Sequence, residues 1–221
     1  ASYADPANLG VREPEDMFSP HHYAAVRGKG REMRALPLWC YTSERFHQAE
    51  IDKIFLPSWN MLEREEVVPN AGDFHCITFL GANLVIARGT DDTVRVFANT
   101  CPHRGASVAE GSGNCKTLRC PYHFWAFGLD GRLIVAPNYT DPDGKPLIDE
   151  SNKEQFDLPE IESGTWGGFI FVRFKQGAET LEDHLGSFVE SFASHKLEAM
   201  ACARTVVYEM DANWKCFVEN Y

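Results

Sequence analysis

The residues with the clearest chemical potential are two cysteines and two histidines in the middle of the chain. One cysteine and one histidine stand in the run Cys-Pro-His-Arg-Gly, and the second pair stands in the run Cys-Pro-Tyr-His. Thiolates and imidazoles both bind metals, and each run offers one of each. If each run gives its cysteine to one iron and its histidine to a second iron, the runs together can hold a two-iron cluster. The sequence therefore predicts a [2Fe-2S] cluster between two loops, with four ligands: Cys101, His103, Cys120 and His123.

Two other interpretations use the same residues. A zinc ion also takes two cysteines and two histidines, but finger-type zinc sites usually place the cysteines together and the histidines together. The four residues could also be unrelated buried thiols and ordinary core histidines. Their reciprocal spacing, and the proline after each cysteine (Pro102 and Pro121), favour one shared site. The iron–sulfur interpretation is preferred, with zinc as its rival.

The composition is that of an ordinary globular protein. The 221 residues can bury one large or two small cores, and 44% of them are hydrophobic and 24% charged. The formal net charge of −11 argues against a nucleic-acid partner, and no apolar run is long enough for a membrane span. With no evident signal peptide, we expect a cytoplasmic location. The remaining cysteines are scattered and are expected to be reduced: Cys40, Cys76, Cys115, Cys202 and Cys216.

Short strands are expected to position the two loops. The arm of residues 1–42 is interrupted by prolines, and Ser43 is suited to cap a helix that Pro57 ends. Runs of β-type residues then alternate with turns, and Asp130-Gly131 predicts a hairpin. This pattern predicts an antiparallel β-sandwich with a two-loop metal-binding tip. The expected strands are 59–62, 74–79, 84–88, 94–98, 124–128, 133–136 and 166–174, with a surface loop at 138–153.

A second unit is expected after Phe174. Apolar residues at helical spacing predict a helix between residues 181 and 192. Residues 205–210 are predicted to form a strand, and 213–221 the start of another element. The fold class expected for the whole chain is α+β.

The two cluster runs, followed by Trp125 and Asp130-Gly131, resemble the Rieske domain of Rieske non-haem iron oxygenases. These are the large subunits of ring-hydroxylating dioxygenases and related monooxygenases. The run 213–221, with Asn-Trp-Lys and Glu-Asn-Tyr, resembles the segment that opens the family's catalytic domain. One departure is Phe124, where the family often has glycine, which puts the local packing of the second loop in question.

The resemblance covers roughly residues 40–221 and implies the N-terminal portion of a longer subunit. Its domains would be an arm (1–42), a Rieske domain with a leading helix (43–174), and the beginning of an α+β catalytic domain (175–221). The resemblance also implies that Asn220 and Tyr221 lie beside the active site, although Asn220 could instead only cap or pack a helix.

The resemblance implies a terminal oxygenase component. A reductase or ferredoxin would supply electrons to the cluster, and a mononuclear Fe(II) centre in the neighbouring subunit of a homotrimer or α3β3 assembly would activate O2. The ligands of that iron are expected outside these residues, because His184 and His195 are wrongly placed. We therefore expect no triad of two histidines and one carboxylate within the chain.

The substrate pocket would lie in the missing part, so several small organic substrates stay open. Hydroxylation of an aromatic compound is the main expectation, and hydroxylation or N-demethylation of a quaternary ammonium compound is the alternative. Two other classes fit less well. A cytochrome bc-type Rieske protein would have disulfide cysteines where this chain has Ala106 and Tyr122, and a stand-alone Rieske ferredoxin would end soon after Phe174.

Overall fold

The computed structural model describes residues 12–220, which form two compact units. One unit contains residues 56–202, and the other contains the described residues up to 55 together with those from 203 onward. The domain limits expected from the sequence, after residues 42 and 174, refer to the functional domains of the family. They stay a prediction.

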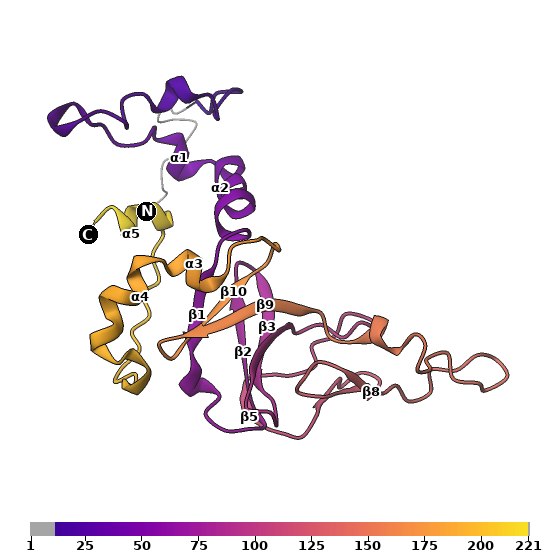
Figure 1. Cartoon of the computed structure of the whole chain (residues 1–221). Coiled ribbons are helices and arrows are strands. Elements are labelled where there is room, and N and C mark those ends of the chain that lie inside the picture. Colours follow the sequence, from indigo (N-terminus) through magenta and orange to yellow (C-terminus); the bar gives the residue numbers. More distant parts are fainter. Residues whose placement is uncertain (1–11, 221) are drawn as a thin grey trace. The chain divides into compact units, whose positions relative to one another are not determined.

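The unit of residues 56–202 is built on two antiparallel sheets (Figure 1). The larger sheet has seven strands in the order β1-β10-β9-β4-β3-β2-β5, and the smaller has the order β6-β7-β8. The expectation of an antiparallel β-sandwich is confirmed. The strands of the larger sheet are β1 (Asn60–Arg64), β2 (Asp73–Phe79), β3 (Ala82–Arg88), β4 (Val94–Ala98), β5 (Ser112–Asn114), β9 (Glu160–Trp166) and β10 (Phe169–Arg173). Those of the smaller are β6 (Leu118–Arg119), β7 (Ala126–Phe127) and β8 (Leu133–Val135).

Strand β3 shows why the core lies on both faces of the larger sheet. Successive side chains of a strand point to opposite faces. Leu84 and Ile86 belong to one buried cluster, whereas Val85 and Ala87 belong to another. The second cluster also contains residues of the smaller sheet and both predicted ligand cysteines, Cys101 and Cys120. The cysteines are therefore embedded in the core that joins the two sheets.

Three expected elements differ from the structure. The expected strand 166–174 is confirmed only as β10, because Gly167 and Gly168 both have positive φ (60° and 79°) and form the turn that joins β9 to β10. The expected strand 124–128 shrinks to β7, because Phe124 has a positive φ of 61°. Residues 205–210 form no strand, and most of their side chains are exposed. They pair with no strand, and a β-type composition does not by itself make a strand.

The hairpin at Asp130-Gly131 is confirmed. Strands β7 and β8 pair in antiparallel fashion, and the Gly128 amide donates to the Arg132 carbonyl across the turn (2.8 Å). Gly131 has a φ of 81°, and a Cβ there would lie 2.4 Å from the Phe97 ring. Residues 138–153 form the expected surface loop, which ends at the short helix η6 (Lys153–Phe156).

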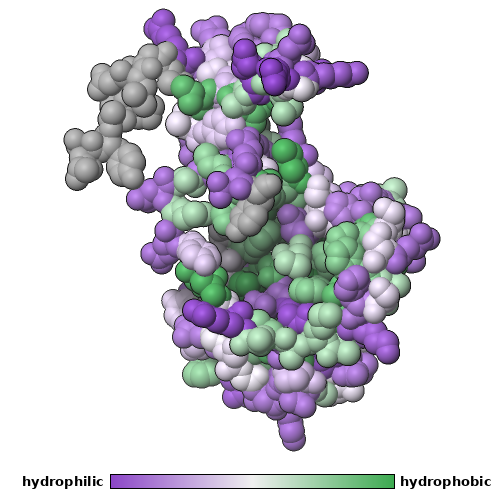
Figure 2. Space-filling view, turned by 90° about the vertical axis from the view of Figure 1, so that its left-hand side faces the viewer, coloured by the Kyte–Doolittle hydropathy of each residue, from purple (hydrophilic) through white to green (hydrophobic). Residues whose placement is uncertain are grey.

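Two short helices replace the single helix expected between residues 181 and 192. Helix α3 (Leu181–Leu185) has a capping box between Thr180 and Asp183. Gly186, at φ 49° and ψ −128°, separates it from α4 (Ser187–Phe192), because these angles are not helical. The face that carries α3 and α4, turned towards the viewer in Figure 2, holds an apolar pocket of about 470 Å³. Two 3-10 turns follow, η7 (Ala193–His195) and η8 (Leu197–Ala199).

The other unit is mainly helical. Ser43 caps α2 (Glu44–Glu50) by accepting a hydrogen bond from the Phe46 amide (3.0 Å), as expected, and the helix continues as a π-helical turn, η4 (Ile51–Phe55). The C-terminal helix α5 (Trp214–Val218) contacts α2 through an ion pair of Lys215 with Glu50 (2.8 Å). The remaining elements of this unit are η2 (Pro20–Tyr23), η3 (Gly30–Glu32) and α1 (Trp39–Thr42). Among the residues that the structure describes, no helix is both long enough and apolar enough to cross a membrane.

Candidate metal centre

The two loops that carry the predicted ligands repeat the same backbone turn. In the first loop, the Cys101 amide donates to the Ala106 carbonyl (2.7 Å) and the Gly105 amide to the Cys101 carbonyl (2.9 Å). In the second, the Cys120 amide donates to the Trp125 carbonyl (2.9 Å) and the Phe124 amide to the Cys120 carbonyl (3.0 Å). Each cysteine thus begins a turn of the same hydrogen-bonded form, which fixes where its side chain points.

The fifth position of each turn has a left-handed backbone. Gly105 occupies it in the first loop with φ 76°, and Phe124 occupies it in the second with φ 61°. A bulky residue with positive φ is strained, by roughly 1–2 kcal/mol relative to glycine. Phe124 nevertheless keeps the turn intact and leaves its ring 59% exposed. The departure noted in the sequence therefore strains the second loop without changing its hydrogen bonding.

The two predicted cysteine ligands form one close pair. Cys101 and Cys120 are free and buried, each only 2% exposed. Burial raises the pKa of the Cys101 thiol, and the adjacent Cys120 thiol raises it further. The backbone amides of His103 and Arg104 point at the Cys101 sulfur and act in the opposite direction. Such amides stabilise a thiolate, so the first loop suits a cysteine that binds metal in its deprotonated form.

The two histidines form a second pair. The ring centroids of His103 and His123 are 4.7 Å apart. Trp125 stacks on the His103 ring at 4.7 Å with nearly parallel planes (2°), and Tyr139 packs edge-on at 5.4 Å. Burial, and then the neighbouring His123, lower the pKa of His103. Both effects favour the neutral imidazole, which is the form that binds a metal.

One polar atom of this pair lacks a partner. Within the described residues, the Nδ1 atom of His123 is buried and makes no hydrogen bond. Buried polar atoms are nearly always satisfied, so an unsatisfied ring nitrogen beside a second imidazole fits a metal ligand. The donor set and this atom together fit a cluster bound between the two loops.

The spacing of the ligands favours two metal ions over one. Zinc–ligand bonds of about 2.0–2.3 Å in a tetrahedral site place the ligand atoms roughly 3.3–3.8 Å apart. Within residues 12–220, one group of three or more potential ligand atoms lies within 4.8 Å of one another, and it does not include these four residues. The cysteines and histidines instead form two separate pairs. A two-iron cluster, with one iron for each pair, fits this arrangement better than a single zinc ion that takes all four ligands.

Asn99 positions the first loop and was missed in the sequence. It is 2% exposed, and its Oδ1 atom accepts from the amides of Val108 (2.9 Å) and Ala109 (3.1 Å). Its Nδ2 atom donates to the Ala109 carbonyl (2.8 Å). One side chain therefore fastens the end of the first ligand loop to the end of β4. Its partners lie nine and ten residues away, so no local motif reveals this role.

Replacing Asn99 by alanine should loosen the first loop. The change leaves the buried Val108 amide and the partly buried amide and carbonyl of Ala109 without this partner, so we expect the free energy of unfolding to fall by about 2–3 kcal/mol. The cluster should also be lost faster in the presence of a chelator. Chemical denaturation and the decay of visible absorption measure the two effects. Thr90→Ala, in an exposed turn, is the control and should change stability by less than about 0.5 kcal/mol. Equal behaviour of the two variants would contradict this role.

Two residues, Asn220 and Tyr221, are predicted to lie near an active site in the catalytic domain. Asn220 follows α5 in the other compact unit and is exposed. Tyr221 lies outside the described residues. Their proximity to an active site stays a prediction.

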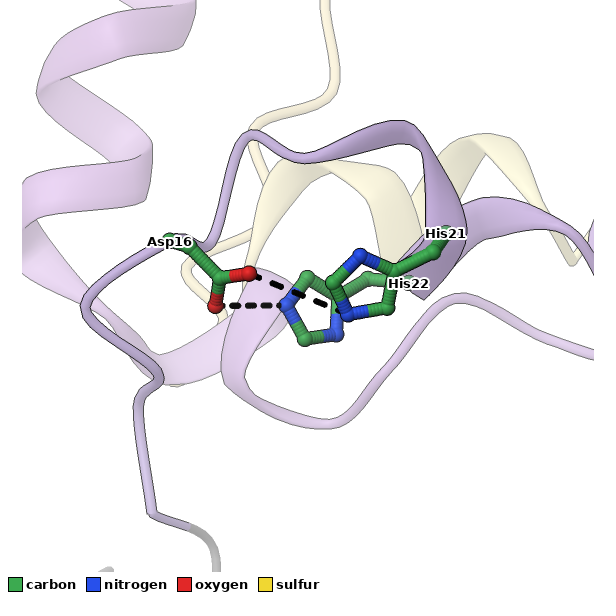
Figure 3. Close-up of side chains that lie close together, drawn as sticks. All are labelled: Asp16, His21 and His22. Atoms are coloured by element: carbon green, nitrogen blue, oxygen red, sulfur yellow. Dashed lines mark hydrogen bonds and ion pairs between the residues drawn. The ribbon is translucent and has the colours of Figure 1, made fainter.

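The expectation that the chain holds no triad of two histidines and one carboxylate is wrong. Asp16, His21 and His22 gather on the surface of the N-terminal arm (Figure 3). The reason is local folding: the Ser19 amide donates to the Asp16 carbonyl (2.7 Å), and this turn leads into η2, which carries both histidines. The triad lies in a different compact unit from the two cluster loops.

Fold and site together define the class of the protein. Residues 58–149 match the family model of the Rieske [2Fe-2S] domain. The chain is 34% identical over 184 residues to the carnitine monooxygenase oxygenase subunit of Acinetobacter baumannii, covering 82% of this chain and 48% of that protein. It is 30% identical over 193 residues to the anthranilate 1,2-dioxygenase large subunit of Burkholderia cepacia, covering 84% of this chain and 45% of that protein.

A solved structure agrees with these matches. The structure of a quaternary ammonium Rieske monooxygenase, described with carnitine oxidation and inter-subunit electron transfer, superposes with a TM-score of 0.73 at 33% identity. The likeness covers 81% of this chain and 48% of that one. The chain therefore belongs to the Rieske oxygenase family, as the resemblance implied, and matches the N-terminal portion of its large subunits. It spans about half the length of the relatives it matches.

Proposed function

We propose that the chain is the cluster-bearing portion of a Rieske monooxygenase that oxidises a quaternary ammonium compound. The observation that carries this proposal is the 34% identity over 82% of the chain to a carnitine monooxygenase oxygenase subunit. The solved structure at TM-score 0.73 is also a quaternary ammonium monooxygenase. These likenesses favour the alternative substrate class over the aromatic compound that the sequence analysis put first.

Cys101 and Cys120 would hold one iron of the cluster, and His103 and His123 the other. The separate thiol and imidazole pairs support this assignment. When bound, the cluster takes up and releases single electrons. The protein residues bury the cysteines, pack Trp125 and Tyr139 against the His103 ring, and keep water away from the sulfur side of the centre.

The rest of the oxygenase would complete the reaction. A mononuclear Fe(II) centre outside these residues would react with O2 and the substrate, and a reductase or ferredoxin would supply the electrons. A homotrimer or an α3β3 assembly is proposed, supported by the inter-subunit electron transfer described for the similar structure. All seven cysteines are free thiols, which fits the reducing cytoplasm in which we place the protein.

The substrate class can be tested on the complete subunit that contains this chain. With a reductase and NAD(P)H, we expect O2 uptake only when L-carnitine or another quaternary ammonium compound is present, and we expect that compound to be consumed. Anthranilate should not be consumed. The His103→Ala variant, which should lack the cluster, is the control and should be inactive. Turnover of anthranilate with no turnover of any quaternary ammonium compound would contradict the proposed substrate and favour an aromatic hydroxylase.

A further inference from the structure

A second group of metal-binding side chains lies on the N-terminal arm, apart from the cluster loops in the sequence. The His22 Nε2 atom is 2.9 Å from Asp16 Oδ1, and the His21 Nε2 atom is 3.8 Å from Asp16 Oδ2. Both imidazole nitrogens therefore face the same carboxylate (Figure 3). All three ligand atoms lie within 4.8 Å of one another.

These separations are close to those of a metal site. With metal–ligand bonds of about 2.0–2.2 Å, neighbouring ligand atoms lie roughly 3 Å apart in an octahedral site and roughly 3.3–3.6 Å apart in a tetrahedral one. The 2.9 Å between His22 and Asp16 and the 3.8 Å between His21 and Asp16 lie close to these values, and a small rotation of the exposed side chains would bring both within the range. Without a cation, the two imidazoles can interact with this carboxylate only through hydrogen bonds or ion pairs.

Neighbouring residues hold two of the three ligands in place. The Ser19 hydroxyl hydrogen-bonds to the His21 Nδ1 atom (2.8 Å), which leaves Nε2 free to face Asp16. His22 packs its ring against the edge of Trp39 (5.6 Å between centroids), and its side chain is only 21% exposed. Hydrogen bonds to the second ring nitrogen orient metal-ligating histidines in known metal sites. The site therefore has three ligands, and neighbouring residues orient two of them.

We propose that Asp16, His21 and His22 form a surface site for a borderline divalent transition-metal ion such as Zn²⁺. Two imidazoles and a carboxylate are the donors that such ions prefer, whereas Mg²⁺ and Ca²⁺ prefer oxygen alone. The Asp16 and His21 side chains are 60% and 64% exposed, so the bound ion keeps water in its remaining positions. The site binds an ion, and no reaction is assigned to it.

The test uses the cluster-loaded chain, freed of loosely bound metal and titrated with Zn²⁺ by calorimetry. The wild type should bind one equivalent of Zn²⁺. The Asp16→Asn and His21→Gln variants should bind it at least tenfold more weakly. The control His195→Gln, at another exposed histidine, should bind it with the wild-type affinity. Ser19→Ala should weaken binding about tenfold, because the ring of His21 loses its hydrogen bond. Circular dichroism of the metal-free variants checks that each one is folded.

The zinc K-edge X-ray absorption spectrum decides where the ion sits, because the iron of the cluster does not contribute to it. We expect nitrogen and oxygen neighbours with the outer-shell scattering of imidazole. Sulfur neighbours would place the ion at cysteines and overturn the proposal. Binding that is unchanged in Asp16→Asn and His21→Gln, or no binding at all by the folded wild type, would also overturn it.

Discussion

The Cys101→Ser protein is expected to be purified without an iron–sulfur cluster, whereas the wild type should contain two irons and an equal amount of acid-labile sulfide per chain. Clusters of this type are held by thiolates and imidazoles, and a serine hydroxyl does not replace a buried thiolate. Without the Cys101 thiol, only Cys120 would remain as a thiolate ligand for the first iron. Iron and sulfide analysis, visible absorption and the rhombic EPR signal of the reduced protein measure this result.

Cys115→Ser is the matched control. Cys115 lies in the segment between the two loops and is half-buried, and burial raises its pKa as it does for Cys101. It is not one of the paired thiols, so its replacement should leave the iron and sulfide content unchanged. A Cys115→Ser protein without a cluster would contradict the assignment of the thiol pair.

The histidine pair has its own control. His123→Ala should abolish the cluster, because the second iron would keep only one imidazole ligand. His75→Ala should not, since His75 hydrogen-bonds to Ser112 on the surface of the sheet (2.7 Å) and is not one of the four predicted ligands. One zinc ion per chain and no sulfide in the wild type would overturn the iron–sulfur assignment altogether.

We expect the second large effect when the ion pair between Glu50 and Lys215 is broken, as a loss of stability against unfolding. Their side chains are only 6% and 8% exposed, and the Lys215 ammonium lies 2.8 Å from the carboxylate. The Trp214 indole also donates to Glu50 (3.2 Å). Glu50→Leu would leave the ammonium buried without a counter-charge. We expect the free energy of unfolding of this unit to fall by about 3–5 kcal/mol, measured by denaturation followed by tryptophan fluorescence.

Two controls separate the buried charge from ordinary loss of contacts. The double variant Glu50→Leu/Lys215→Met removes both charges and should recover most of the lost stability. Glu150→Leu breaks an ion pair with Lys153 in which Glu150 is 95% exposed, and should change stability little. A Glu50→Leu protein as stable as the Glu150→Leu protein would show that the ammonium is not buried in solution.

Elements with local signals could be predicted from the sequence. Ser43 caps α2, because a serine oxygen can accept from an amide three residues ahead wherever a helix begins. Asp130-Gly131 turns β7 into β8, because glycine adopts the positive φ of the turn without strain. The sandwich and the family also followed from spacing and motif. The ligand set follows from the same spacing and stays a prediction until the cluster is analysed.

Other features became visible only in the folded chain, because their partners are distant in the sequence or because two local structures compete. Residues 205–210 have the composition of a strand, but a strand also needs an edge to pair with. Gly186 divides a run with helical spacing, because its backbone leaves the helical region. The spacing of residues in the sequence did not predict the hydrogen bonds of Asn99 to the first loop. It also did not predict the ion pair of Glu50 with Lys215, which are 165 residues apart.

The triad of Asp16, His21 and His22 shows the same limit at short range. The three residues span seven positions, but only the turn at Ser19 and the start of η2 bring both imidazoles to one carboxylate. A sequence motif states which ligands are available, and the backbone decides which of them converge. That is why the sequence found the Cys–His loops, whose two halves repeat one turn, and missed a triad that no repeated pattern marks.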